Sequence, residues 1–116
     1  MNARLKNAVK LDRKIVLYVP ATTNTNQAAD NSAQVDNAAA LLSNLFGGST
    51  IQESAGCWMS DSAGLVKEAT TLVYAFCDEK SMSAGLAAVL DFAADLKLGM
   101  NQESIAVEID GALYLL

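Results

Sequence analysis

Four side chains of this 116-residue chain have the types and spacing to line a small pocket: Trp58, Glu68, Tyr18 and Tyr74. Trp58 stands just before a polar turn at 60–64 and Glu68 just after it, so a hairpin would bring an indole and a carboxylate together. The two tyrosines fall in segments expected to be neighbouring strands and would extend the pocket. Rings around a few polar groups are typical of small-molecule sites, although Trp58 could instead pack at the turn.

The absence of histidine excludes several kinds of catalytic site. The chain has no Ser-His-Asp triad, no Cys-His pair and no imidazole metal ligand. The spacing of its carboxylates matches neither a calcium loop nor a paired-carboxylate hydrolase, and Gly47-Gly48 lacks the rest of a phosphate-binding loop. The sequence therefore predicts no catalytic residue, no metal and no cofactor.

The two cysteines, Cys57 and Cys77, do not fit a zinc or redox motif. We expect two small buried side chains, although a disulfide between neighbouring strands is geometrically feasible. No apolar run approaches the roughly 20 residues of a membrane span, and residues 1–14 do not resemble a signal peptide. The expected location is the cytoplasm.

The net charge of −5 is unevenly distributed. Residues 1–14 contain five basic side chains and one acidic one, a balance of +4, whereas residues 15–116 contain three and twelve, a balance of −9. We therefore divide the chain into a basic N-terminal arm at 1–14 and a single domain at 15–116. Such an arm is either a solvated leader or a binding segment for nucleic acid or an acidic neighbour, and nucleic acid is the less expected partner because the body is acidic.

The first half of the domain is expected to contain a strand, a loop and a helix. The apolar run at 15–19 is typical of a central strand covered on both faces, and the uncharged polar segment at 21–27 predicts a loop. A helix is predicted at 29–46, capped by Asn31 with Gln34 and ended by Gly47-Gly48.

The second half is expected to contain a hairpin, a helix and another hairpin. Strands at 49–59, with Gly56 marking a bulge or a close backbone approach, and at 65–77 flank the polar turn. A helix capped by Asp78 or Ser81 should run to Gly99, because its apolar residues recur at helical spacing. A strand at 104–109, the turn Asp110-Gly111 and a short strand at 112–116 complete the chain.

This order predicts an α+β, ferredoxin-like β-α-β-β-α-β plan, an antiparallel sheet with both helices on one face and a short extra C-terminal strand. The uncovered face would then be closed by a second copy, by a ligand or by a protein partner. We expect Lys67, Thr71, Val73 and Glu108 to lie on that face and to form an interface.

The stretch from Gly56 to Glu68 has the form G-x-W…G-L-V-x-E. Together with Tyr18-Val19-Pro20-Ala21-Thr22 and Glu108-Ile109-Asp110-Gly111, it resembles small uncharacterised bacterial proteins of gut Firmicutes and their mobile elements. The resemblance covers 15–116. It implies a compact single domain with no assigned activity.

Three functions are compatible with these observations. The leading hypothesis is a non-enzymatic interaction module that binds a protein partner or a second copy, as a homodimer, through the open sheet face. The first alternative is a small-ligand-binding regulatory domain, by analogy with other domains of this plan. The second is an enzyme that uses carboxylate or tyrosine chemistry near Trp58, Glu68 and Tyr74.

Overall fold

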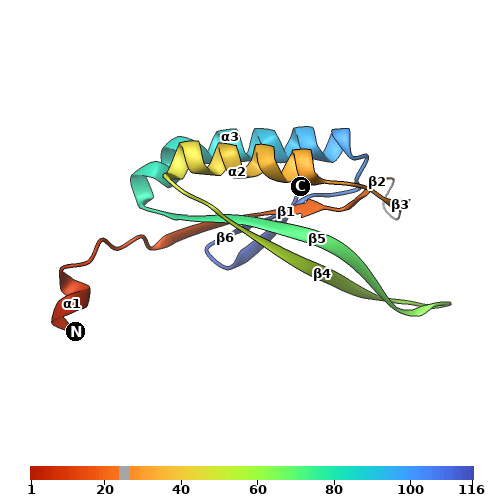
Figure 1. Ribbon diagram of the computed structural model, residues 1–116, viewed down its shortest axis with the longest axis horizontal. Coiled ribbons are helices and arrows are strands. Elements are labelled where there is room, and N and C mark those ends of the chain that lie inside the picture. Colours follow the sequence, from red (N-terminus) through yellow and green to blue (C-terminus); the bar gives the residue numbers. More distant parts are fainter. Residues whose placement is uncertain (24–26) are drawn as a thin grey trace.

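Two helices cover one face of a five-stranded antiparallel sheet in the computed structural model, which describes every residue except 24–26 (Figure 1). The strand order is β4-β5-β1-β6-β7. The elements of this domain are β1 (Arg13–Pro20), α2 (Ser32–Phe46), β4 (Thr50–Ser60), β5 (Gly64–Cys77), α3 (Glu79–Gly99), β6 (Ala106–Ile109) and β7 (Ala112–Leu115). The predicted ferredoxin-like plan with an extra C-terminal strand is confirmed.

Three shorter elements lie outside this sheet. α1 (Ala3–Lys6) is a single exposed turn of helix in the N-terminal arm. β2 (Thr22–Thr23) and β3 (Gln27–Ala28) pair with each other in the segment expected to be a loop. Positions 24–26 of that expected loop lie outside the described residues.

β1 is the central strand and pairs with β5 on one side and β6 on the other. Ile15, Leu17 and Val19 are fully buried under the helices, and Val16 on the opposite face is buried as well. Strands buried on both faces are typically continuous apolar runs, which explains why this segment could be recognised from its sequence. The helices complete the core with side chains such as Leu42 and Val89.

Helix α2 begins at Ser32, three residues later than predicted, and Asn31 stands at its N-cap position without a side-chain capping hydrogen bond. The Asn31 side chain instead donates from Nδ2 to Thr71 Oγ1 at 3.1 Å and to the Val19 carbonyl at 3.4 Å, which ties the start of the helix to the sheet. The Ser32 amide donates to Asp30 Oδ1. The predicted end is confirmed, since Gly47 adopts a φ of +90°.

The β4–β5 hairpin is the longest feature of the sheet, and its far half projects beyond the helices (Figure 1). The two strands stay in register from Thr50 opposite Tyr74 to Ser60 opposite Gly64. The bulge considered at Gly56 is therefore absent from this pairing. The close approach is absent as well, because a Cβ there would meet only the Glu68 carbonyl, at an ordinary 3.9 Å.

Three of the four residues expected on the open face lie elsewhere. Thr71 and Val73 are buried beneath the helices, and Lys67 shares their side of β5, further out on the hairpin. Only Glu108, opposite Val16, projects from the uncovered face. Apolar side chains occur on both faces of β5. The alternation of residues along this strand therefore does not show which face the helices cover, and the predicted assignment of Lys67, Thr71 and Val73 to the open face is wrong.

The β6–β7 turn is fastened to the start of β1. Asp110 and Gly111 have φ values of +51° and +88°, as the predicted tight turn requires. The Lys14 amide donates to Asp110 Oδ1 at 2.9 Å and the Arg13 Nε to Oδ2 at 2.7 Å, and these bonds hold the pKa of Asp110 below its ordinary value. Arg13 also pairs with Glu79.

Helix α3 is capped by Asp78, whose Oδ1 accepts from the Ser81 amide. No helix among the described residues has the length and apolarity needed to cross a bilayer.

The two helices meet at Gly85, and this contact predicts a measurable stability difference. A Cβ on Gly85 would lie 3.0 Å from the Phe46 ring and 3.4 Å from Leu45, whereas one on Gly99 of the same helix would meet nothing within 4 Å. We expect Gly85→Leu to lower the free energy of unfolding by about 1–3 kcal/mol, because the facing helix must move. Gly99→Leu, the matched control, should change it by less than about 0.5 kcal/mol or raise it. Urea denaturation measures both, and equal stabilities would contradict this packing.

Candidate functional site

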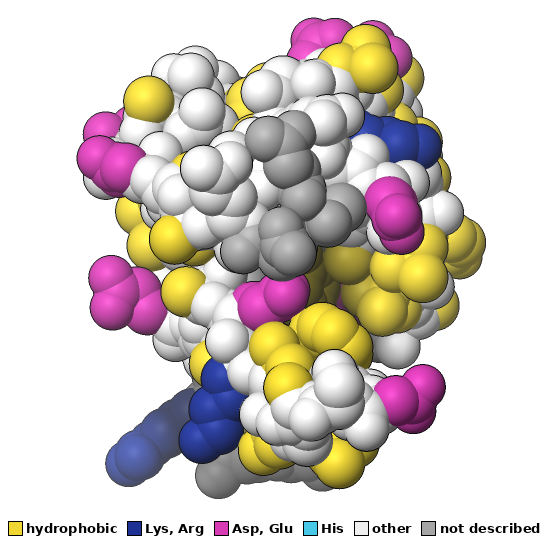
Figure 2. All heavy atoms as spheres, turned by 90° about the vertical axis from the view of Figure 1, so that its right-hand side faces the viewer, with side chains coloured by type: hydrophobic (Ala, Val, Ile, Leu, Met, Phe, Trp, Pro, Cys, Tyr) yellow, Lys and Arg dark blue, Asp and Glu magenta, His cyan; other side chains and the backbone are white. Residues whose placement is uncertain are grey.

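A cavity of about 240 Å³ opens between the root of the projecting hairpin and the segment that leads into β6. Figure 2 views the molecule from the hairpin end and shows a hollow between the hairpin and the body, with hydrophobic and acidic side chains around it. The lining residues are Tyr18, Pro20, Thr22, Gly56, Glu68, Ala69, Thr70, Gln102, Ser104, Ile105, Ala106 and Leu115. The site thus combines residues from both hairpins and the central strand.

The hairpin brings Trp58 and Glu68 together, as expected from the sequence. The Trp58 Nε1 donates to Glu68 Oε1 at 3.3 Å, and the indole remains half exposed. Glu68 lies directly opposite Gly56, which has no side chain. The carboxylate therefore borders open space on one side and an aromatic ring on the other.

Tyr18 contributes a phenol from the central strand, and Glu108 of β6 fixes its orientation. The Tyr18 hydroxyl donates to Glu108 Oε1 at 3.1 Å. Burial, and then the bond to Glu108, raise the pKa of Tyr18 above its ordinary value. The phenol is therefore held as a neutral hydrogen-bond donor beside a carboxylate, at the wall of the cavity.

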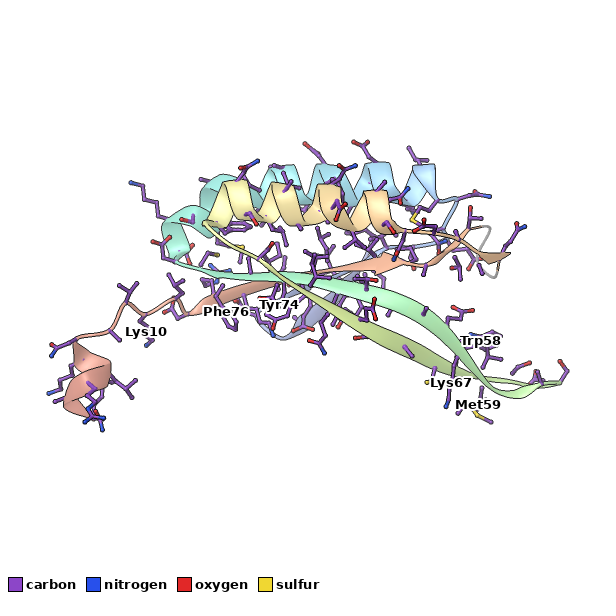
Figure 3. The ribbon with its side chains drawn as sticks, viewed as in Figure 1. Lys10, Trp58, Met59, Lys67, Tyr74 and Phe76 are labelled. Carbon is purple, nitrogen blue, oxygen red and sulfur yellow. The ribbon has the colours of Figure 1, made fainter. Side chains whose placement is uncertain are left out.

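Tyr74 does not take part in this site. It is six residues from Glu68 along β5, or about 20 Å at the rise of a strand. Figure 3 shows it beside Phe76, near the arm and far from Trp58. The Tyr74 ring contacts the Phe76 ring edge-on, and Lys14 Nζ lies 4.7 Å from its centroid. The predicted four-residue pocket is therefore wrong at this position.

The segment between α3 and β6 contributes residues that the sequence analysis did not single out. Gln102 Nε2 donates to the Thr22 carbonyl at 2.7 Å and to the Met100 carbonyl at 3.3 Å, which places Gln102 and Ser104 at the cavity. The polar run between Met100 and Ile105 was the available signal. Because a polar loop after a helix is common, this run by itself does not predict a site.

The charge of the site favours a cationic ligand. Glu68 lines the cavity, Glu108 binds its tyrosine, and no described lining residue is basic. The described residues also contain no group of three or more His, Cys, Asp or Glu that could hold a metal ion.

Of the two cysteines, both of which are free, Cys57 is exposed and Cys77 is buried. Only Cys77 therefore matches the burial expected from the sequence.

No protein-family model matches the chain, and no curated protein matches it significantly in sequence. Two solved structures share its fold. One is a phage SAM lyase in complex with S-methyl-5'-thioadenosine, with 15% identity, a TM-score of 0.64, and 95% of this chain and 92% of that chain covered. The other is a phage SAM lyase in the apo state, with 15% identity, a TM-score of 0.63 and 94% of each chain covered.

These similarities correct the leading functional hypothesis. The expected non-enzymatic interaction module is contradicted, because the two solved structures described above are of an enzyme. Its expected interface also fails, since Thr71 and Val73 are buried inside the domain. The homodimer, the cytoplasmic location and the resemblance to Firmicutes proteins stay predictions.

The Tyr18–Glu108 pair predicts a pH effect on stability. Because the pKa of Tyr18 is raised, the folded protein holds this proton more tightly than the unfolded chain does. This stabilisation is fully present below the ordinary tyrosine pKa of 10.0 and is lost as the pH rises through the folded pKa. Glu108→Gln removes the charged acceptor, so we expect a lower tyrosine pKa and a smaller loss of unfolding free energy above pH 10.

Spectrophotometric titration of phenolate absorbance, with urea denaturation at neutral and alkaline pH, measures both effects. Glu103→Gln, on an exposed loop residue, is the control with the same chemical change. Identical curves for Glu108→Gln and the unaltered chain would refute the pairing.

Proposed function

We propose that this chain is a lyase that cleaves S-adenosylmethionine and releases S-methyl-5'-thioadenosine. The observation that carries the proposal is the acidic, aromatic-edged cavity, whose described lining contains a carboxylate but no basic side chain. Its support from similarity is the fold shared with a phage SAM lyase bound to S-methyl-5'-thioadenosine. The proposed reaction belongs to the enzyme alternative of the sequence analysis, and the proposal uses Trp58 and Glu68 with Tyr18 instead of Tyr74.

The chemistry suits a chain without histidine. Conversion of S-adenosylmethionine to S-methyl-5'-thioadenosine breaks the bond between sulfur and the amino-acid side chain, and the bonding electrons pass to sulfur. The positively charged sulfonium thus leaves as a neutral thioether and needs no proton from a general acid. In a lyase reaction no water enters, so an oxygen of the substrate's own carboxylate bonds to the side-chain carbon as the carbon–sulfur bond breaks. The four-carbon amino-acid fragment leaves as a lactone, which is lighter by one water than the product of hydrolysis.

The charges of the substrate suggest how the cavity is used. S-adenosylmethionine has a sulfonium, which loses its charge in the reaction, and an ammonium, which keeps it. A carboxylate next to the sulfonium would stabilise the substrate more than the transition state, whereas one next to the ammonium would hold both equally. We therefore assign Glu68 to the ammonium and the apolar wall of Pro20, Ile105 and Leu115 to the sulfonium.

The aromatic groups complete this assignment. Trp58 does not line the cavity, but its Nε1 donates to Glu68, which does. Its half-exposed indole would offer a flat surface for the adenine ring next to the cavity. The Tyr18 hydroxyl, held by Glu108, presents a fixed polar group within the same cavity.

The activity test is incubation of the purified chain with S-adenosylmethionine, followed by mass spectrometry of the products. We expect S-methyl-5'-thioadenosine and an amino-acid fragment without added water. Glu68→Gln should lower kcat/KM by about 10–100-fold, mainly through KM, because the amide has no negative charge to attract the ammonium. Glu53→Gln, a matched change on the opposite side of the hairpin, should retain activity.

Product formation no faster than in buffer would overturn the proposed reaction. A fragment containing one added water would make the chain a hydrolase. Equal effects of Glu68→Gln and Glu53→Gln would remove Glu68 from the site.

Binding can be tested separately, because Trp58 is the only tryptophan of the chain. We expect its fluorescence to change on titration with S-methyl-5'-thioadenosine and with S-adenosylmethionine. Added salt should weaken binding of the cationic substrate more than that of the neutral product, because salt screens the carboxylates. The same salt response for both compounds would contradict charge recognition, and Trp58→Phe is the control for the origin of the signal.

A further inference from the structure

The side-chain oxygen of Gln34 is buried without a hydrogen-bond partner. Gln34 stands three residues after Asn31, as in a capping box, but the Asn31 side chain bonds to the sheet and Gln34 Oε1 accepts no hydrogen bond. In the part of the chain that the structure describes, no other buried side-chain oxygen or nitrogen lacks a partner. A buried acceptor of this kind lowers stability, so we expect its donor to come from outside the chain, as a water or a ligand.

Gln34 lines a cavity of about 210 Å³ between the start of α2 and the end of α3, two helices that lie side by side (Figure 1). The apolar part of the lining comes from Phe92, Leu96 and Met100, and the last two of these side chains are buried. Asn37 and Asp95 line the cavity as well, at exposed positions. The cavity therefore combines an apolar wall with polar groups that solvent reaches.

The polar groups of this cavity suit a cation that donates hydrogen bonds. The Asp95 carboxylate only accepts, Gln34 contributes an acceptor without a donor, and the described lining contains no basic side chain. The cavity also lies at the C-terminal end of α3, where the helix dipole is negative. Lys97 belongs to the same turn of helix but does not line the cavity. These features favour an ammonium or a guanidinium over a neutral or anionic group.

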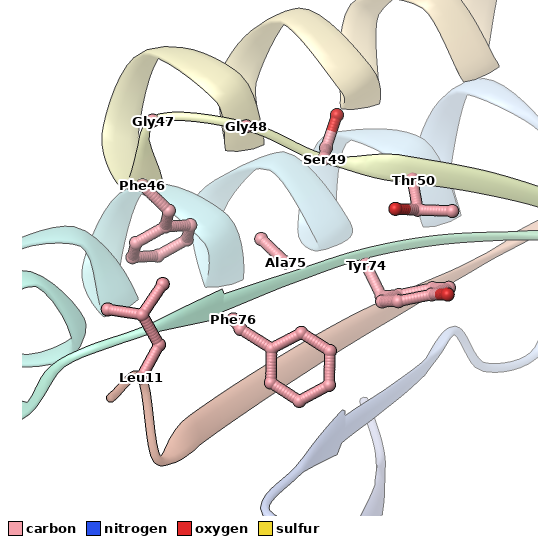
Figure 4. A pocket seen from close by; sticks show the side chains of 9 residues that line it. All are labelled: Leu11, Phe46, Gly47, Gly48, Ser49, Thr50, Tyr74, Ala75 and Phe76. Carbon is pink, nitrogen blue, oxygen red and sulfur yellow. The ribbon is translucent and has the colours of Figure 1, made fainter. Parts of the chain in front are cut away.

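A larger cavity, of about 450 Å³, lies where α2 ends and β4 begins, and the rings of Phe46, Tyr74 and Phe76 contribute to its lining (Figure 4). Its described lining residues include no acidic or basic side chain, and none of them has a buried polar side-chain atom without a partner. The chemistry of this larger cavity therefore does not select a ligand, whereas that of the cavity at Gln34 does.

We propose that the cavity at Gln34 and Asp95 binds an ammonium or guanidinium group carried on a short apolar chain. The cationic end donates to Gln34 Oε1 and to the Asp95 carboxylate, and the apolar end packs on Phe92, Leu96 and Met100. A guanidinium has several N–H groups in a fixed fork, so it can donate to both acceptors at once. This cavity shares no described lining residue with the one assigned to S-adenosylmethionine, and the proposal does not depend on lyase activity.

The first experiment titrates the chain with butylguanidinium and with its neutral analogue butylurea, and follows the side-chain amide of Gln34 by NMR. We expect a Kd of about 0.1–1 mM for butylguanidinium and at least about tenfold weaker binding of butylurea. Asp95→Asn should weaken binding of butylguanidinium at least about tenfold, because the carboxylate is lost. Asp61→Asn, the same change in the hairpin turn, should weaken it by less than about twofold.

Three results of this titration would overturn the proposal. They are the absence of any response to butylguanidinium, equal affinities for butylguanidinium and butylurea, and equal effects of Asp95→Asn and Asp61→Asn.

The second experiment separates a ligand site from a structural role of the buried oxygen. Gln34→Met removes this oxygen and keeps a side chain of similar length. Without ligand, we expect it to raise the unfolding temperature by about 2–5 °C, because a buried polar atom without a partner is lost. It should also weaken binding of butylguanidinium at least about tenfold. Gln52→Met, at an exposed position of β4, should leave binding unchanged.

A lower or unchanged unfolding temperature of Gln34→Met would mean that an ordered water satisfies the oxygen, and this would overturn the proposal. Unchanged binding would overturn it as well. A free small cation and the Arg or Lys side chain of a protein share the proposed chemistry, and the tripeptide Gly-Arg-Gly distinguishes them. Binding tighter than that of butylguanidinium identifies a protein side chain as the occupant, and weaker binding identifies a free cation.

Discussion

The pairing of β1 with both of its neighbours is the constraint on which the rest of the structure depends. This strand is buried on both faces and bonded on both edges, so it fixes the register of β5 and β6 at once. A slip of one residue would move Ile15, Leu17 and Val19 out of the core and Tyr18 into it. The register that buries Ile15, Leu17 and Val19 also places Tyr18 on the other face of the sheet, where it lines the cavity. The position of the cavity therefore follows from the burial of the central strand.

Much of the fold could be predicted because its signals are local. The apolar run of β1, the left-handed glycine after α2 and the Asp110-Gly111 turn each depend on a few adjacent residues. Asn31 shows the limit of such signals. Its type and position suit a helix cap, but the amide serves better as a link to Thr71, which comes near only through the sheet. The face of β5 could not be assigned for the same reason, since Val73 is buried by its position opposite Leu17.

The candidate site likewise combines one contact that a local sequence pattern predicts and one that forms only through the sheet. Trp58 and Glu68 lie ten residues apart across one turn, so the hairpin pattern was sufficient to place them together. Tyr18 and Glu108 are 90 residues apart and meet only through the pairing of β1 with β6, which no local pattern specifies. The separation of Tyr74 from Glu68, by contrast, follows from the sequence alone, because it is set by the rise of a single strand.

The last strand has a practical consequence for work with this protein. Leu115, on the edge strand β7, lines the cavity beside Glu68, and Leu116 bonds through its backbone to Ile105. Any residues joined after Leu116 would therefore begin at the mouth of the cavity. A C-terminal affinity tag or fluorescent fusion could shield the site from its ligand or supply charges that the cavity lacks, whereas a cleavable N-terminal tag would lie at the opposite end of the molecule. Proteins prepared for enzymology should therefore have nothing fused after Leu116.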